Sequence, residues 1–133
     1  MNLFNQRIIN KAILGAGDIP SDHLETLSNW PDAIKGRSEV AIQGDFKARI
    51  VENILGYQGA TGSEKQTVDA EHQMGTGRVD LALGYFDDGG KNFVIAPFEL
   101  KGADTINLDA PMPGRNISPV QQAWNYANAV TND

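Results

Sequence analysis

Hydrophobic positions in the first part of the chain recur every three or four residues, the period of an amphipathic helix. This spacing predicts a helix over 1–14 that closes at Gly15 and a second helix that starts near Ser21. We expect the second helix to break at Pro31, because the residue before a proline avoids the α-helical region. The stretch 36–44 is polar and rich in glycine at its ends, and it predicts a connection rather than an element.

A clearer helical pattern runs from Asp45 to Gly56. Aspartate is among the residues that cap helix N-termini, and glycine commonly ends a helix. Glu52 lies at the flank of the apolar arc, given the ~100° step between helical residues. That arc consists of Phe46, Ile50, Val51, Ile54 and Leu55.

Beyond residue 65 the hydrophobic period changes to that of strands. The stretch 66–72 is a weak strand candidate, whereas 78–86 alternates well and turns Asp80 away from its apolar side chains. The stretch 92–101 is apolar on both faces until Glu99, as in the central strand of a sheet. The apolar set opposite Asp80 is Val79, Leu81, Leu83 and Tyr85.

The segment 87–90, Asp-Asp-Gly-Gly, predicts a tight hairpin between the last two strands. A turn centred on its two glycines would place Asp80 directly opposite Glu99, and a turn one residue earlier would move the partner to Pro97 on the same face. Lys101 shares the face of Glu99, because strand side chains alternate. Carboxylates opposed across strands destabilise a sheet, so their pairing requires a compensating cation.

The stretch 102–116 is a loop rich in proline, glycine and aspartate, and a last helix opens after it. Ser118 is a good N-cap, a proline occupies the first helical position, and Gln121 can complete a capping box. Gln122 and Tyr126 then lie one helical turn apart on one face.

Bulk composition narrows the classes of function. At 133 residues the chain suits one domain, and its net charge of −6 argues against binding nucleic acid by charge alone. It contains no cysteine, so thiolate chemistry is excluded, and we expect a reducing, cytoplasmic setting. No signal peptide or membrane-spanning stretch is present, and the chain stops within or just after a helical pattern. We therefore expect a piece of a longer protein.

The ordered residues Asp80, Glu99-Leu100-Lys101 and Gln122…Tyr126 resemble the D…ExK…QxxxY pattern of PD-(D/E)XK nucleases. The match covers about 45–130. The stretches 97–102 and 118–124 further resemble the amino-terminal nuclease domains of restriction–modification proteins, which carry a methyltransferase downstream. The resemblance implies an α/β fold with a restriction-endonuclease-like central mixed sheet flanked by helices. It also implies a single nuclease domain over 1–133, with a helical extension (1–44) and a catalytic core (45–133).

The same resemblance implies a Mg²⁺-dependent deoxyribonuclease, with Mn²⁺ as the alternative metal. Asp80, Glu99 and the Leu100 carbonyl would hold the ion, and Lys101 would orient or deprotonate the attacking water. The remaining roles are an auxiliary carboxylate, Glu52, and two residues that brace the site or meet the DNA backbone, Gln122 and Tyr126.

The implied partners are DNA and the downstream methyltransferase and target-recognition domains of the parent protein. A single site cuts one strand, so duplex cleavage would need a homodimer or sequential nicks. Five basic residues could line one side of the phosphate path: Lys65, Arg78, Lys91, Lys101 and Arg115.

Plainer interpretations stand beside these. Asp80 could be a solvated strand residue, and Glu99 with Lys101 an exposed ion pair of little energetic value. Glu52 could be the polar flank of a helix, and His72 could be a ligand or base of a different metal hydrolase. A non-catalytic scaffold or partner-binding domain that keeps the nuclease fold is the alternative function, and an RNA or nucleotide hydrolase is a third.

Overall fold

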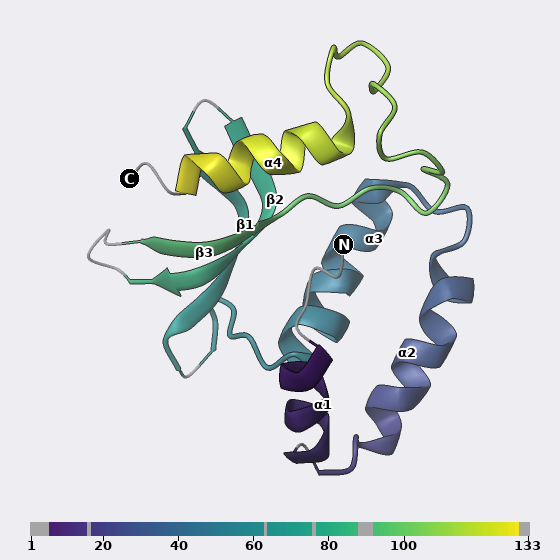
Figure 1. Ribbon diagram of the computed structural model, residues 1–133, viewed down its shortest axis with the longest axis vertical. Helices are drawn as coiled ribbons and strands as arrows, with labels where there is room; N and C mark the ends of the chain where they lie inside the picture. The colour runs from purple at the N-terminus through teal and green to yellow at the C-terminus, as the bar shows by residue number, and fades with distance from the viewer. Residues whose placement is uncertain (1–5, 16, 63, 76, 88–91, 131–133) are drawn as a thin grey trace. The chain divides into compact units, whose positions relative to one another are not determined.

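The computed structural model describes residues 6–15, 17–62, 64–75, 77–87 and 92–130. The chain forms two compact units, Met1–Ala33 and Ile34–Asp133 (Figure 1). The expected division at residues 44 and 45 falls inside the second unit.

The first unit contains α1 (Gln6–Gly15) and most of α2 (Ser21–Ile34), so the two predicted helices are confirmed where they are described. Residues 1–5 of the first prediction lie outside the described residues. The predicted break at Pro31 is wrong, because α2 continues through it. A proline inside a helix removes one N–H donor and displaces one carbonyl. No described residue of α2 is buried, so water can solvate the carbonyl that is freed.

The predicted polar connection over 36–44 is also wrong, because it contains α3 (Glu39–Asp45). Ser38 caps this helix, and its Oγ accepts a hydrogen bond from the Ala41 N–H at 3.4 Å. The helix runs on into a π-helix, η1 (Phe46–Ile54), and the side chain of Asp45 makes no capping bond. The buried Ile42 extends the apolar arc backwards, so tertiary packing overrides the glycines around it.

The sheet has three strands in the order β1 (Gln66–Met74), β2 (Gly77–Phe86) and β3 (Phe93–Phe98). Both pairs are antiparallel. The α/β class, the three strands and the flanking helices are therefore confirmed. A mixed sheet also needs a parallel pair, which the described strands do not form.

A β-bulge sets the register that matters for the site. Next to the hairpin Tyr85 pairs with Phe93, but beyond a shift at Gly84 the pairing becomes Leu81 with Phe98. Continued by one residue, this register places Asp80 opposite Glu99, the partner predicted from a Gly-Gly turn. The turn residues 88–91 lie outside the described residues.

Gly84 makes the bulge possible. A Cβ built there would overlap the Phe93 carbonyl oxygen and lie 3.0 Å from Val94 Cα. Because only glycine tolerates so close a backbone approach, Gly84 indirectly helps to bring Asp80 opposite Glu99.

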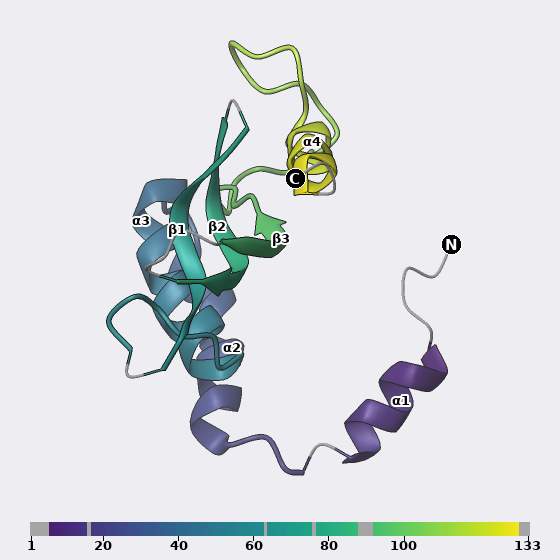
Figure 2. The same cartoon turned by 90° about the vertical axis from the view of Figure 1, so that its left-hand side faces the viewer.

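Helices cover both faces of the sheet, with α3 and η1 on one side and α4 (Pro119–Val130) on the other (Figure 2). One apolar cluster joins Val51 of η1 to Val68, Leu81 and Leu83. The second cluster packs α4 against the sheet and consists of Met74, Val79, Ala82 and Phe86.

The predicted one-sided apolar set of β2 is therefore partly wrong. Val79 belongs to the cluster beneath α4, and Tyr85 is exposed. Residues on both faces of β2 are buried, because helices cover both faces of the sheet (Figure 2).

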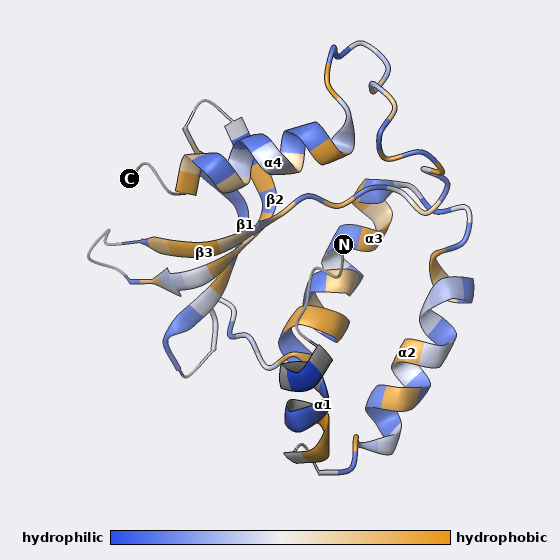
Figure 3. Ribbon diagram, in the orientation of Figure 1, coloured by the Kyte–Doolittle hydropathy of each residue, from blue (hydrophilic) through white to orange (hydrophobic). Residues whose placement is uncertain are grey.

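The start of α4 agrees with its sequence signal. Ser118 Oγ accepts the Gln121 N–H at 3.1 Å, which confirms the N-cap. The Gln121 side chain instead donates to Asn125 at 2.8 Å, so the reciprocal half of the capping box is not formed. Apolar and polar residues alternate around α4 (Figure 3), which fits a helix with one face on the sheet. Among the described residues, no helix is long and apolar enough to cross a membrane.

Candidate functional site

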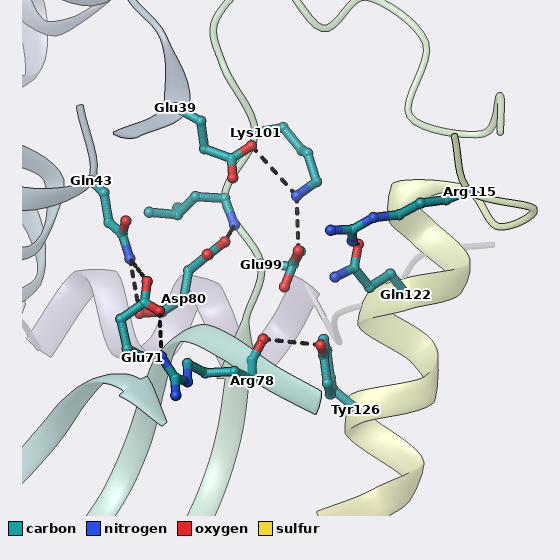
Figure 4. A network of polar contacts seen from close by, with 11 residues as sticks. Glu39, Gln43, Glu71, Arg78, Asp80, Glu99, Lys101, Arg115, Gln122 and Tyr126 are labelled. Atoms are coloured by element: carbon teal, nitrogen blue, oxygen red, sulfur yellow. Dashed lines mark hydrogen bonds and ion pairs between the residues drawn. The ribbon is translucent and has the colours of Figure 1, made fainter. Parts of the chain in front are cut away.

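The segment that follows β3 brings Glu99 and Lys101 close to Asp80 of β2 (Figure 4). The Leu100 N–H donates to Asp80 Oδ2 at 2.6 Å, and Lys101 Nζ lies 2.8 Å from Glu99 Oε1. The shared face predicted for Glu99 and Lys101 is thus confirmed. The strand predicted to reach residue 101 ends earlier, at Phe98. The Leu100 N–H bonds to a side chain rather than to a strand carbonyl, so the segment leaves the sheet while it stays attached to β2.

Burial separates this cluster from an ordinary surface ion pair. The side chain of Glu99 is 7% exposed and that of Lys101 is 15% exposed. Glu99 Oε2 is buried and has no hydrogen-bond partner within the described part of the chain. A buried carboxylate oxygen without a partner is costly, and such groups call for an ion, a water or a ligand.

The electrostatics of the cluster follow from burial and from its excess of acids. Burial raises the pKa of Asp80 and of Glu99, and each carboxylate also lies in the negative field of Glu39. Burial alone would lower the pKa of Lys101, but the hydrogen bond to Glu99 and the surrounding carboxylates outweigh it and raise the pKa. The cluster therefore disfavours two ionised carboxylates and favours a charged ammonium.

Helix α3 supplies two residues that the sequence analysis missed. Glu39 Oε2 lies 3.5 Å from Lys101 Nζ. Gln43 Nε2 donates to the Asp80 carbonyl at 3.3 Å and to Glu71 Oε1 at 3.2 Å. The available signal was the Ser38 cap with Glu39 and Gln43 one helical turn apart on one face.

Glu71, on β1, is a third residue that the pattern did not single out. Its neighbours pair with Val79 and Leu81, so it stands opposite Asp80. Its φ of 55° is in the left-handed region, which non-glycine residues seldom adopt. Its side chain reaches Arg78, with Oε2 to Nη1 at 3.5 Å. No pattern in the sequence indicates this conformation.

The residues predicted on the last helix lie beside the cluster. Gln122 is buried, and its Oε1 accepts a hydrogen bond from Arg115 Nη1 at 3.3 Å. Tyr126 packs in the second apolar cluster, and its hydroxyl donates to the Arg78 carbonyl at 3.0 Å. Figure 4 shows the Arg115–Gln122 pair on the α4 side of Glu99. Gln122 thus connects α4 to the Arg115 side chain, and Tyr126 connects it to the backbone of β2 at Arg78.

The other residues considered as site residues from the sequence are not brought to the cluster by any described contact. Glu52 pairs with Lys47 at 2.5 Å, and none of its described contacts reaches the cluster. His72 Nδ1 lies 2.7 Å from Asp69 Oδ2, and its ring meets Phe86 edge-on at 5.1 Å between centroids. Lys65 is exposed, and Lys91 lies outside the described residues.

The carboxylate oxygens of Asp80 and Glu99 are ligands of the type that a hard cation such as Mg²⁺ prefers. Across the described ranges, no group of three or more His, Cys, Asp or Glu side chains is placed to hold a metal. Mg²⁺, however, is often held by one or two carboxylates and completes its shell with water and substrate phosphate. Asp80, Glu99 and the unpartnered Glu99 Oε2 match that requirement.

Comparisons of the chain with protein-family models, with curated proteins and with solved structures found no match.

Proposed function

We propose that this chain is a metal-dependent endonuclease module that hydrolyses DNA phosphodiester bonds, as the nuclease part of a restriction–modification enzyme. One observation carries the proposal: just after β3, the Leu100 N–H between Glu99 and Lys101 is hydrogen-bonded to Asp80, and one buried oxygen of Glu99 has no partner in the described chain. The finer fold proposed with it is the restriction-endonuclease-like arrangement, completed by strands beyond the described sheet.

Asp80 and Glu99 would hold the Mg²⁺ ion, with Mn²⁺ as the alternative and the Leu100 carbonyl as a further ligand. When bound, such an ion polarises the phosphate and lowers the pKa of a water molecule. The protein's part is to present two carboxylates at one point. The 2.6 Å bond from the Leu100 N–H to Asp80 and the contact of Gln43 with the Asp80 carbonyl hold β2 there.

Lys101 would orient the attacking water and stabilise negative charge on the phosphate oxygens. A fixed cation in a water-poor site contributes far more to such stabilisation than a solvated one. Glu99 and Glu39 hold the ammonium from two sides, at 2.8 and 3.5 Å. Glu39 is in this respect a positioning residue, and it takes the auxiliary place that the sequence assigned to Glu52.

DNA contacts would come from Arg78 and Arg115, the basic residues of Figure 4 that approach the cluster from β2 and from the loop before α4. A net charge of −6 makes tight DNA binding by this chain alone unfavourable. Most affinity and all target recognition would then come from the downstream methyltransferase and target-recognition domains. Cutting both strands would need a second copy or sequential nicks.

A plasmid-nicking assay with Mg²⁺ tests the proposal. Lys101→Ala should lower the rate about 100-fold or more, the usual cost of removing one charge-stabilising group. Lys35→Ala, at an exposed lysine with no role in the site, is the matched control and should cut as the unchanged protein does. Unaltered cleavage by Lys101→Ala would contradict the proposed nuclease function. Charge reversal at Arg78 or Arg115 without loss of cleavage would remove only the proposed phosphate path.

A non-catalytic scaffold is the second candidate, and one observation favours it. Asp80 and Glu99 already have internal partners in the Leu100 N–H and in Lys101, as in a site that keeps its fold without a metal. Calorimetric titration with Mg²⁺ or Mn²⁺ separates the two candidates. Heat that disappears in Glu99→Ala supports the nuclease, and the absence of carboxylate-dependent heat supports the scaffold.

A further inference from the structure

A cavity of about 360 Å³ opens directly beside the acidic cluster, between the loop that follows Lys101 and the first turns of α4. Glu99 and Lys101 form one end of it, and Leu108, Val120 and Ala123 form apolar walls. The Val120 N–H donates to the Leu108 carbonyl at 3.2 Å, so the loop and the helix are joined where they face each other. The cavity is thus a built feature of the fold.

Several apolar side chains at and near this cavity are exposed to solvent, which is unfavourable unless something covers them. Leu108 is 46% exposed and Val120 is 50% exposed. Trp124, one turn after Val120 on α4 and outside the cavity lining, is 63% exposed. Exposed apolar side chains that gather next to a polar site commonly mark a binding surface. Thr105 adds a hydroxyl to the lining, so the cavity combines apolar walls with a hydrogen-bonding group.

The position of the cavity restricts what can enter it. A phosphodiester held by Asp80, Glu99 and Lys101 has a nucleoside attached on each side, and the cavity lies within reach of one of them because Glu99 and Lys101 also line it. A nucleobase has two apolar faces and a polar edge, which suits apolar walls with a hydroxyl. A base in a duplex is stacked and paired, so it cannot occupy such a cavity unless it first leaves the helix.

We propose that the cavity binds the nucleobase of an unpaired nucleotide next to the scissile phosphate. The preferred substrate is therefore single-stranded or locally unpaired DNA. This inference rests on the proposed nuclease function and names its substrate class. Apolar contact with Leu108, Val120 and Ala123 then supplies much of the affinity, which fits a chain of net charge −6. Binding therefore depends on salt less steeply than it does for a basic DNA-binding protein.

Binding without metal tests the inference separately from catalysis. The probe is a fluorescent oligothymidylate, compared by anisotropy in EDTA with the same strand annealed to oligodeoxyadenylate. Leu108→Gln and Val120→Gln place a polar amide in the cavity at half-exposed positions that tolerate it. Leu55→Gln is the matched control, because Leu55 is 55% exposed and lines a different cavity of the same unit.

The expected result is tighter binding of the single strand than of the duplex. Each cavity variant should then lose about fivefold or more in affinity, and the control should lose none. In a Trp30→Phe background, Trp124 is the remaining tryptophan, and its fluorescence should change when oligothymidylate binds. Both cavity variants should retain the unfolding temperature of the unchanged protein.

Two results would overturn the inference. Equal or better binding of the duplex, or cavity variants that bind oligothymidylate as the control does, would show that the cavity does not take a base. If plasmid cleavage still depended on Lys101 in that case, the proposed nuclease would stand and only its substrate class would fall. Absence of Lys101-dependent cleavage on any DNA would overturn the nuclease proposal and this inference with it.

Discussion

Lys101 Nζ lies 2.8 Å from Glu99 Oε1, while the other oxygen of that carboxylate is buried without a partner in the described chain. The negative charge of Glu99 is thus paired with one cation, but one of its oxygens accepts no hydrogen bond from the described residues. A buried polar atom without a partner costs free energy of folding. An ion, a water or a ligand that binds at this oxygen would offset that cost.

Asp80→Asn should stabilise the protein at neutral pH by up to about 1 kcal/mol, measured by thermal unfolding. Burial and neighbouring acids raise the pKa of Asp80 above its usual 3.8, so its ionised form opposes folding. This cost appears as the pH rises through the raised pKa and is absent below the usual value. The gain from the substitution should therefore vanish in acid. Asparagine can still accept the Leu100 N–H.

The matching control for Asp80→Asn is the response to metal. Mg²⁺ should raise the unfolding temperature of the unchanged protein, because an ion that binds only the folded state stabilises it, and should leave the variant unaffected. An equal change in stability at neutral and acid pH would contradict the assigned cost of ionising Asp80.

Comparing Glu39→Gln with Glu52→Gln tests which helical carboxylate assists Lys101: the one that the structure places beside it or the one that the sequence analysis assigned. Glu39 lies 3.5 Å from Lys101, whereas Glu52 pairs with Lys47. Glu39→Gln should lower kcat for nicking about fivefold with little change in KM, because a misplaced catalytic group lowers the rate of the chemical step. Glu52→Gln should remain within about twofold of the unchanged protein. The reverse ranking would restore the auxiliary role that the sequence assigned to Glu52.

Gly84→Ala should destabilise the fold by about 3 kcal/mol or more, because the added methyl group would overlap the Phe93 carbonyl and disrupt the bulge. Gly44→Ala provides the comparison, since a Cβ there meets nothing within 4 Å and the residue lies in α3. Alanine favours the helix by about 1 kcal/mol over glycine, so this variant should be slightly more stable. Urea unfolding measures both. A tolerated Gly84→Ala would show that the bulge is not needed.

Glu71→Gly should be more stable than Glu71→Ala by about 1 kcal/mol. Both variants lose the contacts with Gln43 and Arg78. The difference between their free energies of unfolding therefore measures the steric cost of a side chain at a φ of 55°. Glycine adopts that region at no steric cost. Equal stability in denaturant unfolding would mean that β1 relaxes to an ordinary strand conformation once the carboxylate is gone.

Local patterns were sufficient for several features of the site. The alternation along β2 identified Asp80 as the polar exception, and the two-residue spacing brought Glu99 and Lys101 together. The Ser118 cap is likewise a short-range effect, since its partner is three residues away. Each of these depends on the chemistry of neighbouring positions, which a sequence carries directly.

Errors arose where distant contacts outweigh local preference. Glycines at 36 and 44 suggested a connection, yet packing of Ile42 stabilises a helix there and brings Glu39 to Lys101. The bulge near Ile95 and the left-handed Glu71 depend on how β1, β2 and β3 fit together. No single segment encodes them.

The sequence by itself determined which groups are available: two carboxylates on neighbouring strands, a lysine two residues after one of them, and a capped helix that carries Gln122. Only the tertiary structure decided which helical carboxylate meets Lys101, and that Glu99 keeps a buried oxygen without a partner in the described chain. The type and spacing of residues are local properties. Burial and cross-strand register, in contrast, arise only when α3, the sheet and α4 pack together, and they decide the charge state and accessibility of the site.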